Sequence, residues 1–110
     1  MDIISFEDFR KLDIKIGKVL SAERIEGADK LLKLVFDLGD KEIQVLAGIA
    51  QFVDDPQSLI GKEMPVVVNL EPRRMKGLDS NGMILAVSAV EGAFSLLIAS
   101  DTIPPGTRVS

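Results

Sequence analysis

The feature that most constrains the fold is an alternation of side chains with a period of two. Between residues 31 and 38 an apolar side chain occupies every second position, and Gly39-Asp40 then leads into a second alternating stretch at 43–47. Two alternating runs joined by a short turn that contains glycine are typical of a β-hairpin. The predicted inward face consists of Leu32, Leu34, Phe36, Leu38, Ile43, Val45 and Ala47.

Other strands flank this hairpin. Alternating apolar residues predict a first strand that starts at Leu12 and bends at Gly17, a fourth strand at 64–70 and a fifth at 82–90. Residues 72–81 are predicted to form a loop. A further apolar run at 94–98 opens a C-terminal extension.

Capping patterns predict two short helices. Ser5 is an N-cap before a helix whose phenylalanines lie on the core, and Asp55-Pro56 starts a second helix that ends at Gly61. Three strands, a short helix and two strands are the order of an oligonucleotide/oligosaccharide-binding (OB) barrel. We therefore expect an all-β, five-stranded OB-fold barrel with a short N-terminal helix, a short helix between strands three and four, and a C-terminal extension.

The residue types that are missing exclude many chemistries. The chain has no cysteine, histidine, tryptophan or tyrosine, so it offers no imidazole base, thiol nucleophile or thiolate zinc site. We expect no enzyme, no cofactor and no metal. A chain of 110 residues fits a single domain, 1–110.

Segments with net positive charge alternate along the chain with segments of net negative charge. The net charge of −4 argues against a general nucleic-acid coating protein, but Arg73, Arg74 and Lys76 concentrate three cations in four residues. Such a run is either a solvated turn or a phosphate site. No apolar run is long enough to cross a bilayer and the first residues lack the order of a signal peptide, so we expect a cytoplasmic protein with no membrane partner.

The predicted fifth strand is apolar on both faces, and so, nearly, is the run at 94–98. In an isolated small barrel, each strand should carry polar side chains on the face that is exposed to solvent. We expect a second copy of the chain to cover these strands in a homodimer. The alternative is that the N-terminal helix and the C-terminal tail cover them within one subunit.

Several short motifs together resemble the tRNA-binding domain family. This family includes the C-terminal domain of methionyl-tRNA synthetases, a stand-alone bacterial structure-specific tRNA-binding protein and the endothelial monocyte-activating polypeptide-like domain. The resemblance covers nearly the whole chain and is carried by residues 9–19, 27–31 (with Ala-Asp-Lys-Leu), 46–49 (Leu-Ala-Gly-Ile), 59–62, 69–77, 80–86 (with Ser-Asn-Gly-Met) and 105–106.

The resemblance implies non-catalytic binding of folded tRNA, directed at shape and backbone, by a homodimer or by a detached C-terminal domain or subunit of methionyl-tRNA synthetase. The lack of tyrosine and tryptophan agrees with this, because sequence-specific readers on this barrel use aromatic platforms. The synthetase is therefore a candidate partner besides tRNA.

Matching the family residue by residue gives the candidate RNA contacts. Arg73, Arg74 and Lys76 would contact phosphates, followed by Lys30 and the outward-facing Lys33. Ser80 and Asn81 would bond sugar or base edges, and Met83 would either lie against a base or belong to the core. The glycines of these motifs, Gly27, Gly48, Gly77 and Gly82, are taken as backbone requirements.

A second interpretation is a peptide-binding secretion chaperone of the CsaA type, which shares the barrel and resembles this chain at 13–17 and 69–74. The motifs at 28–31 and 80–83 favour the tRNA interpretation. Many members of the tRNA-binding family also carry a Glu-x-His-Pro segment where this chain reads Glu23-Arg24-Ile25-Glu26-Gly27, so one donor is missing from that loop.

Overall fold

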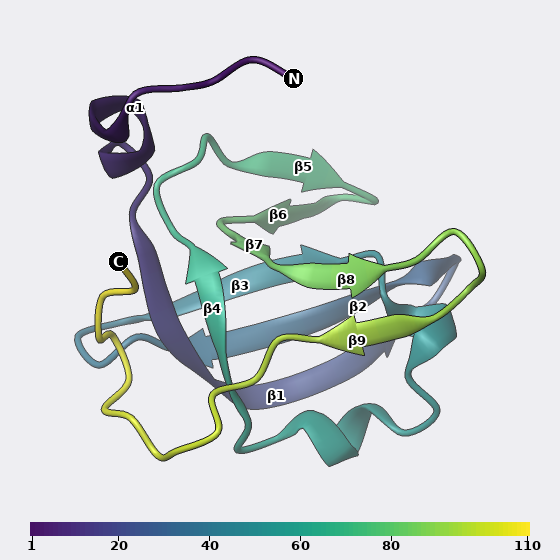
Figure 1. Cartoon of the computed structure of the whole chain (residues 1–110). Helices are drawn as coiled ribbons and strands as arrows, with labels where there is room; N and C mark the ends of the chain where they lie inside the picture. Colours follow the sequence, from purple (N-terminus) through teal and green to yellow (C-terminus); the bar gives the residue numbers. More distant parts are fainter.

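The computed structural model describes all 110 residues and shows an antiparallel β-barrel with peripheral hairpins (Figure 1). Five strands form the main sheet in the order β3-β2-β1-β4-β7, and two two-stranded sheets pair β5 with β6 and β8 with β9. The elements are α1 (Phe6–Arg10), β1 (Ile14–Ile25), β2 (Ala28–Asp37), β3 (Glu42–Ala47), the 3₁₀ helices η1 (Ala50–Phe52) and η2 (Pro56–Leu59), β4 (Glu63–Val67), β5 (Arg73–Met75), β6 (Leu78–Ser80), β7 (Met83–Ile84), β8 (Ala86–Ser88) and β9 (Phe94–Leu96).

The predicted all-β OB-type barrel is confirmed, and the predicted hairpin forms one end of its main sheet. β2 and β3 pair from Leu32 with Ala47 to Asp37 with Glu42. Ala28, Leu32, Leu34 and Phe36 of β2 are buried, and Phe36 is fully enclosed in the core. Burying such large apolar side chains is the main favourable contribution to the stability of the barrel.

The long first strand bends, but not where the sequence pattern placed the bend. The pairing of β1 with β2 shifts register between Val19 and Ser21, so the bulge lies at Leu20. Gly17 has a different reason to be glycine: a Cβ atom there would lie 2.8 Å from the ring of Phe36. Gly17 is therefore required by the packing of Phe36 against its backbone and not by a bend of the strand.

Both predicted helix caps are confirmed. The Ser5 hydroxyl accepts from the amide of Asp8, and Asp55 caps η2 by accepting from Gln57. The expectation that α1 lies on the core was wrong, because the helix buries no side chain and Phe6 is 72% exposed. No helix of the structure has the length and apolar character needed to cross a membrane.

Two other sequence predictions need correction between residues 72 and 90. The predicted loop at 72–81 contains the β5–β6 hairpin, in which Arg73 pairs with Ser80 and Met75 with Leu78. The predicted fifth strand at 82–90 divides in two: β7 pairs with β4, whereas β8 turns away and pairs with β9. The apolar run at 82–90 is divided because β7 belongs to the main sheet and β8 belongs to the two-stranded sheet with β9.

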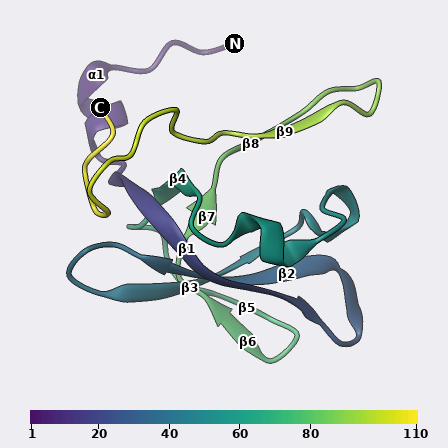
Figure 2. The same cartoon turned by 90° about the horizontal axis from the view of Figure 1, so that it is seen from below.

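The C-terminal tail completes the barrel at the edge of β1 (Figure 2). Three backbone hydrogen bonds join residues 106–109 to Ile14 and Ile16, and a bridge pairs Lys15 with Arg108. The turn before this segment meets the β2–β3 turn closely: a Cβ atom on Gly39 would lie 2.6 Å from the carbonyl oxygen of Pro105, and one on Gly106 would collide with the carbonyl of Leu38. Two glycines thus let two turns interlock.

We expect Gly106→Ala to lower the free energy of unfolding by at least about 3 kcal/mol, since it combines backbone strain at positive φ with a collision. Gly61→Ala is the matched control, because Gly61 has nearly the same φ but open space around its Cβ position. The control should lose only about 1–2 kcal/mol. Urea denaturation measures both variants, and equal losses would refute the interlocked turns.

Candidate nucleic-acid interface

The β5–β6 hairpin is fixed to the edge of β3 by three hydrogen bonds. The amide of Leu46 donates to the hydroxyl of Ser80 at 3.0 Å, the amide of Asn81 donates to the carbonyl of Gln44 at 2.8 Å, and the Gln44 side chain donates to the carbonyl of Asp79 at 2.9 Å. These bonds satisfy backbone groups that an edge strand would otherwise expose. The hairpin is therefore a positioned element of the barrel.

A tight turn presents the cations of this hairpin. Lys76 and Gly77 both have positive φ, 52° and 78°, which is the conformation of a two-residue type I′ hairpin turn. The Lys76 side chain is exposed at this tip, and Arg73 and Arg74 are exposed on the strand before it. The three cations that the sequence singled out are thus displayed together.

The five predicted cations are not equally available. Arg74 donates to Asp79 at 3.0 Å, and the ammonium group of Lys33 lies 3.7 Å from Glu23. Both pairs are cross-strand neighbours in the sheets. Lys30, Arg73 and Lys76 form no salt bridge and no side-chain hydrogen bond, so their full charge faces solvent.

The three predicted polar and sulfur contacts also differ. Ser80 is only 4% exposed, and its hydroxyl accepts from Leu46 and donates to the carbonyl of Gly82 at 3.1 Å. This serine therefore holds the hairpin in place and offers no group outward. Asn81 and Met83 are exposed, and the Asn81 amide makes no side-chain hydrogen bond within the chain.

Beside the hairpin lies a hollow of about 440 Å³ that the sequence did not predict; we call it the hairpin hollow. Its walls come from β2, β3 and the following turn, β5, β7 and β8, and eight of its ten lining residues are apolar. They are Leu31, Leu46, Ala47, Gly48, Ile49, Arg73, Met75, Met83, Ile84 and Ala86. The hollow thus brings Arg73 and Met83 together and borders on Leu31, the residue next to Lys30.

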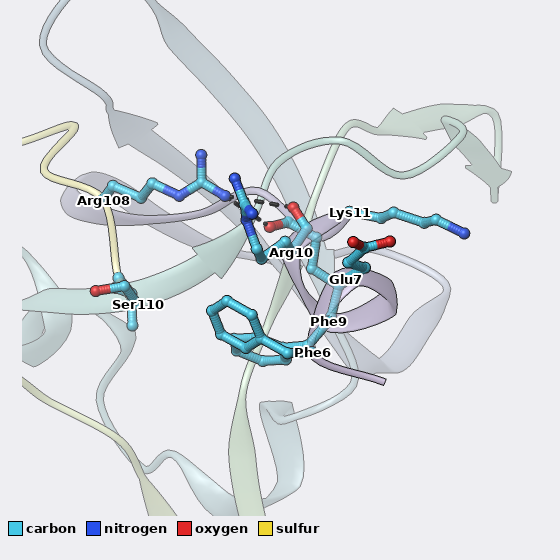
Figure 3. Close-up of a pocket in the computed structure, with 9 residues that line it drawn as sticks. Phe6, Glu7, Phe9, Arg10, Lys11, Arg108 and Ser110 are labelled. Carbon is cyan, nitrogen blue, oxygen red and sulfur yellow. Dashed lines mark hydrogen bonds between the residues drawn. The ribbon is translucent and has the colours of Figure 1, made fainter. Parts of the chain in front are cut away.

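A separate hollow of about 540 Å³ lies at α1 and the tail (Figure 3). The rings of Phe6 and Phe9 lie at one side of it, and the guanidinium of Arg108 reaches across to the carbonyls of Arg10 and Leu12 at 3.4 Å. None of the predicted RNA contacts lines this hollow. It belongs to a different part of the surface.

The loop that departs from the family pattern has a structural use for its arginine. Arg24 donates to the carbonyls of Ala50, Val53 and Asp54 at 3.1, 2.7 and 3.2 Å. These bonds tie the loop around η1 to β1. Arg24 therefore does not replace the missing histidine as a donor toward a ligand.

Residues 14–108 match the family model described as "Putative tRNA binding domain". The chain is 41% identical over 108 residues to a methionine–tRNA ligase of Enterococcus faecalis, a match that covers 97% of this chain and 16% of the ligase. The chain spans about one sixth of the length of the curated relatives it matches.

Two solved structures are similar over almost their full length. One, a protein of Pyrococcus horikoshii described as MetRS related, has a TM-score of 0.94 at 34% identity and full coverage of both chains. The other, described as the chaperone CsaA of Bacillus anthracis, has a TM-score of 0.89 at 33% identity and covers 99% of this chain and all of its own.

We expect Ser80→Ala to lower the free energy of unfolding by about 1–3 kcal/mol, because it leaves the buried amide of Leu46 without a partner. Ser58→Ala removes an exposed hydroxyl that also bonds a backbone carbonyl, and should change stability by no more than about 0.5 kcal/mol. Denaturant titration compares the two variants. An equally small loss at both positions would mean that Ser80 does not hold the hairpin.

Proposed function

The chain belongs to the tRNA-binding domain family, and from this membership we propose that it binds folded tRNA without catalysing a reaction on it. The observation that carries the proposal is the match of residues 14–108 to the family model. Three of the predicted cations, Arg73, Arg74 and Lys76, are displayed on a fixed hairpin beside the hairpin hollow, and this surface supports the proposal. tRNA is the partner.

The charges favour contact with the phosphate backbone. Arg73 and Lys76 are unpaired at the hairpin, and Lys30 is unpaired at the start of β2. Unpaired surface cations gain most from phosphates, since binding releases condensed counterions from the RNA. Arg74 and Lys33 would first have to leave their carboxylates, so we assign them a smaller share. Asn81 and Met83 would contact sugar or base edges.

Shape and backbone recognition suits the positions of the aromatic side chains. Phe36 is enclosed in the core, and Phe52 stacks on Phe94 with ring centroids 4.4 Å apart and planes 5° apart. Phe6 and Phe9 lie at α1. No aromatic side chain lines the hairpin hollow, so the platform on which single-strand readers stack successive bases is missing there.

The relation to the ligases gives the proposal its biological setting. The chain corresponds to about one sixth of each ligase it matches. We propose that it acts in the cytoplasm as a detached C-terminal domain or accessory subunit of methionyl-tRNA synthetase, and that it raises the affinity of the enzyme for tRNA. Its partner in that role is the synthetase.

A homodimer is the second part of the proposal. One side of the molecule carries the N-terminal segment, α1, the tail and the β8–β9 hairpin, whereas β5 and β6 lie on the opposite side (Figure 2). This side, which we call the apolar side, keeps large hydrophobic side chains exposed: Ile3, Ile4, Phe6, Val87, Val90, Leu97 and Ile98. A surface of this kind marks a contact between proteins. Neither α1 nor the tail covers these residues within one subunit.

The likeness to CsaA supports a second candidate function, in which the same barrel holds unfolded peptides. The hairpin hollow has mainly apolar walls, which suit an apolar peptide segment. The two functions respond differently to charge, because a phosphate site depends on the cations at its rim and an apolar groove does not.

We expect Arg73→Glu with Lys76→Glu to lower the affinity for a folded tRNA transcript at least about tenfold, since attraction to phosphates becomes repulsion. Both residues are exposed and unpaired, so the melting temperature should barely change. Fluorescence anisotropy at fixed salt measures the affinity. The matched control is Lys41→Glu with Lys62→Glu, which makes the same charge change at two exposed lysines outside the hairpin.

Equal losses in the two double variants would mean that net charge and not the hairpin governs binding. A wild type that binds no tRNA but suppresses aggregation of an unfolded client would establish the chaperone function instead.

We expect the wild type to sediment as a dimer at micromolar concentration and Val90→Glu to sediment as a monomer. Val90 is fully exposed, so the change costs the subunit nothing but would bury a charge at the contact. Leu20→Glu, at an exposed leucine of β1 that is not among the residues of the apolar side, should remain dimeric. A monomeric wild type would contradict the proposed dimer.

A further inference from the structure

Gly48 is the one glycine that the fold does not explain. Six of the nine glycines have positive φ, and Gly17 and Gly82 are closely approached by other atoms of the chain. Gly48 has neither property, since its φ is not positive and a Cβ atom would meet nothing within 4 Å. The expectation that it is a backbone requirement was therefore wrong. Any L-residue fits the backbone at this position.

Gly48 lies on the wall of the hairpin hollow. It is the middle residue of a three-residue turn after β3, closed by a hydrogen bond of 2.8 Å from the amide of Ile49 to the carbonyl of Ala47. Gly48 is one of the residues that line the hollow, and no other atom lies within 4 Å of its Cβ position, so we expect a large side chain there to extend into the hollow. A glycine that the fold does not need is typical of a place where a ligand approaches the backbone closely.

The walls of the hollow show what kind of ligand fits. Leu46, Met75 and Met83 supply apolar and polarisable surface, and the volume lies in the range of sites that hold small molecules. The only charged residue in the lining is Arg73, and no carboxylate lines the hollow. These apolar walls and the single cation Arg73 fit a ligand in which a flat, largely apolar group is covalently joined to a negative charge.

We propose that the hairpin hollow accepts one unpaired nucleobase of the bound RNA, with Gly48 leaving room for the ring and Arg73 holding the adjoining phosphate. This inference rests on the proposed tRNA binding and deepens it. Loops of folded RNA expose bases that leave the stack, and proteins read such bases in pockets. Thioether and leucine side chains can cover the faces of the ring where aromatic residues are missing.

Charge complementarity favours a nucleotide over a peptide as the occupant. The free cations Arg73 and Lys76 lie on the hairpin that lines the hollow, and Lys30 directly precedes Leu31, another lining residue. A neutral apolar peptide would make no use of them. A nucleotide uses both the apolar walls and the cationic rim.

Filling the hollow tests the inference. Gly48→Leu should weaken binding of a folded tRNA transcript by about tenfold or more, since the base loses its site. The slope of log affinity against log salt should stay within about one of the wild-type value, because every cation is kept and at most the phosphate beside the excluded base loses its contact. Affinity for a blunt RNA duplex with the same number of phosphates should not change, since all of its bases are stacked.

A second variant guards against a folding defect at Gly48. Ala86→Leu fills the hollow from β8, and Ser58→Leu is its control at an exposed position of η2 outside the hollow. Ala86→Leu should weaken tRNA binding as Gly48→Leu does, and Ser58→Leu should bind like the wild type. Melting curves confirm that each variant is folded.

Three outcomes would overturn the inference. If the wild type binds tRNA and both folded hollow variants bind it equally well, the hollow holds no base although the proposed function stands. If the variants keep tRNA affinity but no longer suppress aggregation of an unfolded client, the hollow takes a peptide. If the wild type binds no tRNA at all, the proposed function fails and the inference fails with it.

Discussion

The hydroxyl group of Ser80 joins the two ends of the sheet. The main sheet runs from β3 to β7, and a barrel forms only if these two strands are connected across the remaining gap. Ser80 accepts from the amide of Leu46 on β3 and donates to the carbonyl of Gly82 just before β7. Because the same residue ends β6, closing the barrel also places the β5–β6 hairpin, its cations and one wall of the hairpin hollow.

Much of the fold could be predicted because its central parts obey local rules. The alternation in β2 and β3, the caps at Ser5 and Asp55 and the barrel order all follow from side-chain periodicity and turn chemistry. The β5–β6 hairpin escaped prediction because each strand has three residues and is mostly polar. The division of 82–90 escaped because an apolar run does not reveal which sheet each half will join.

The sequence could predict which residues belong to the candidate site, but not which of its cations are free of salt bridges. The sequence identified the cations, but whether a cation is free depends on its cross-strand neighbour. Lys33 faces Glu23 and Arg74 faces Asp79 through pairings that exist only once the strands are in register. The roles of Ser80 and Gly48 were likewise hidden, since burial and open space are properties of the assembled barrel.

The pairing of residues 106–109 with β1 has a consequence for synthesis of the chain. β1 is synthesised before the other strands of the domain, but one edge of its first half stays unpaired until nearly the whole domain has been translated. An unpaired strand edge attracts other strands, so the nascent domain is exposed to wrong pairings for most of its synthesis. Contacts this distant in sequence also slow folding. The pairing of the tail with β1 can form only after the rest of the domain has been synthesised, and it then seals the first strand and locks the turn at Gly39.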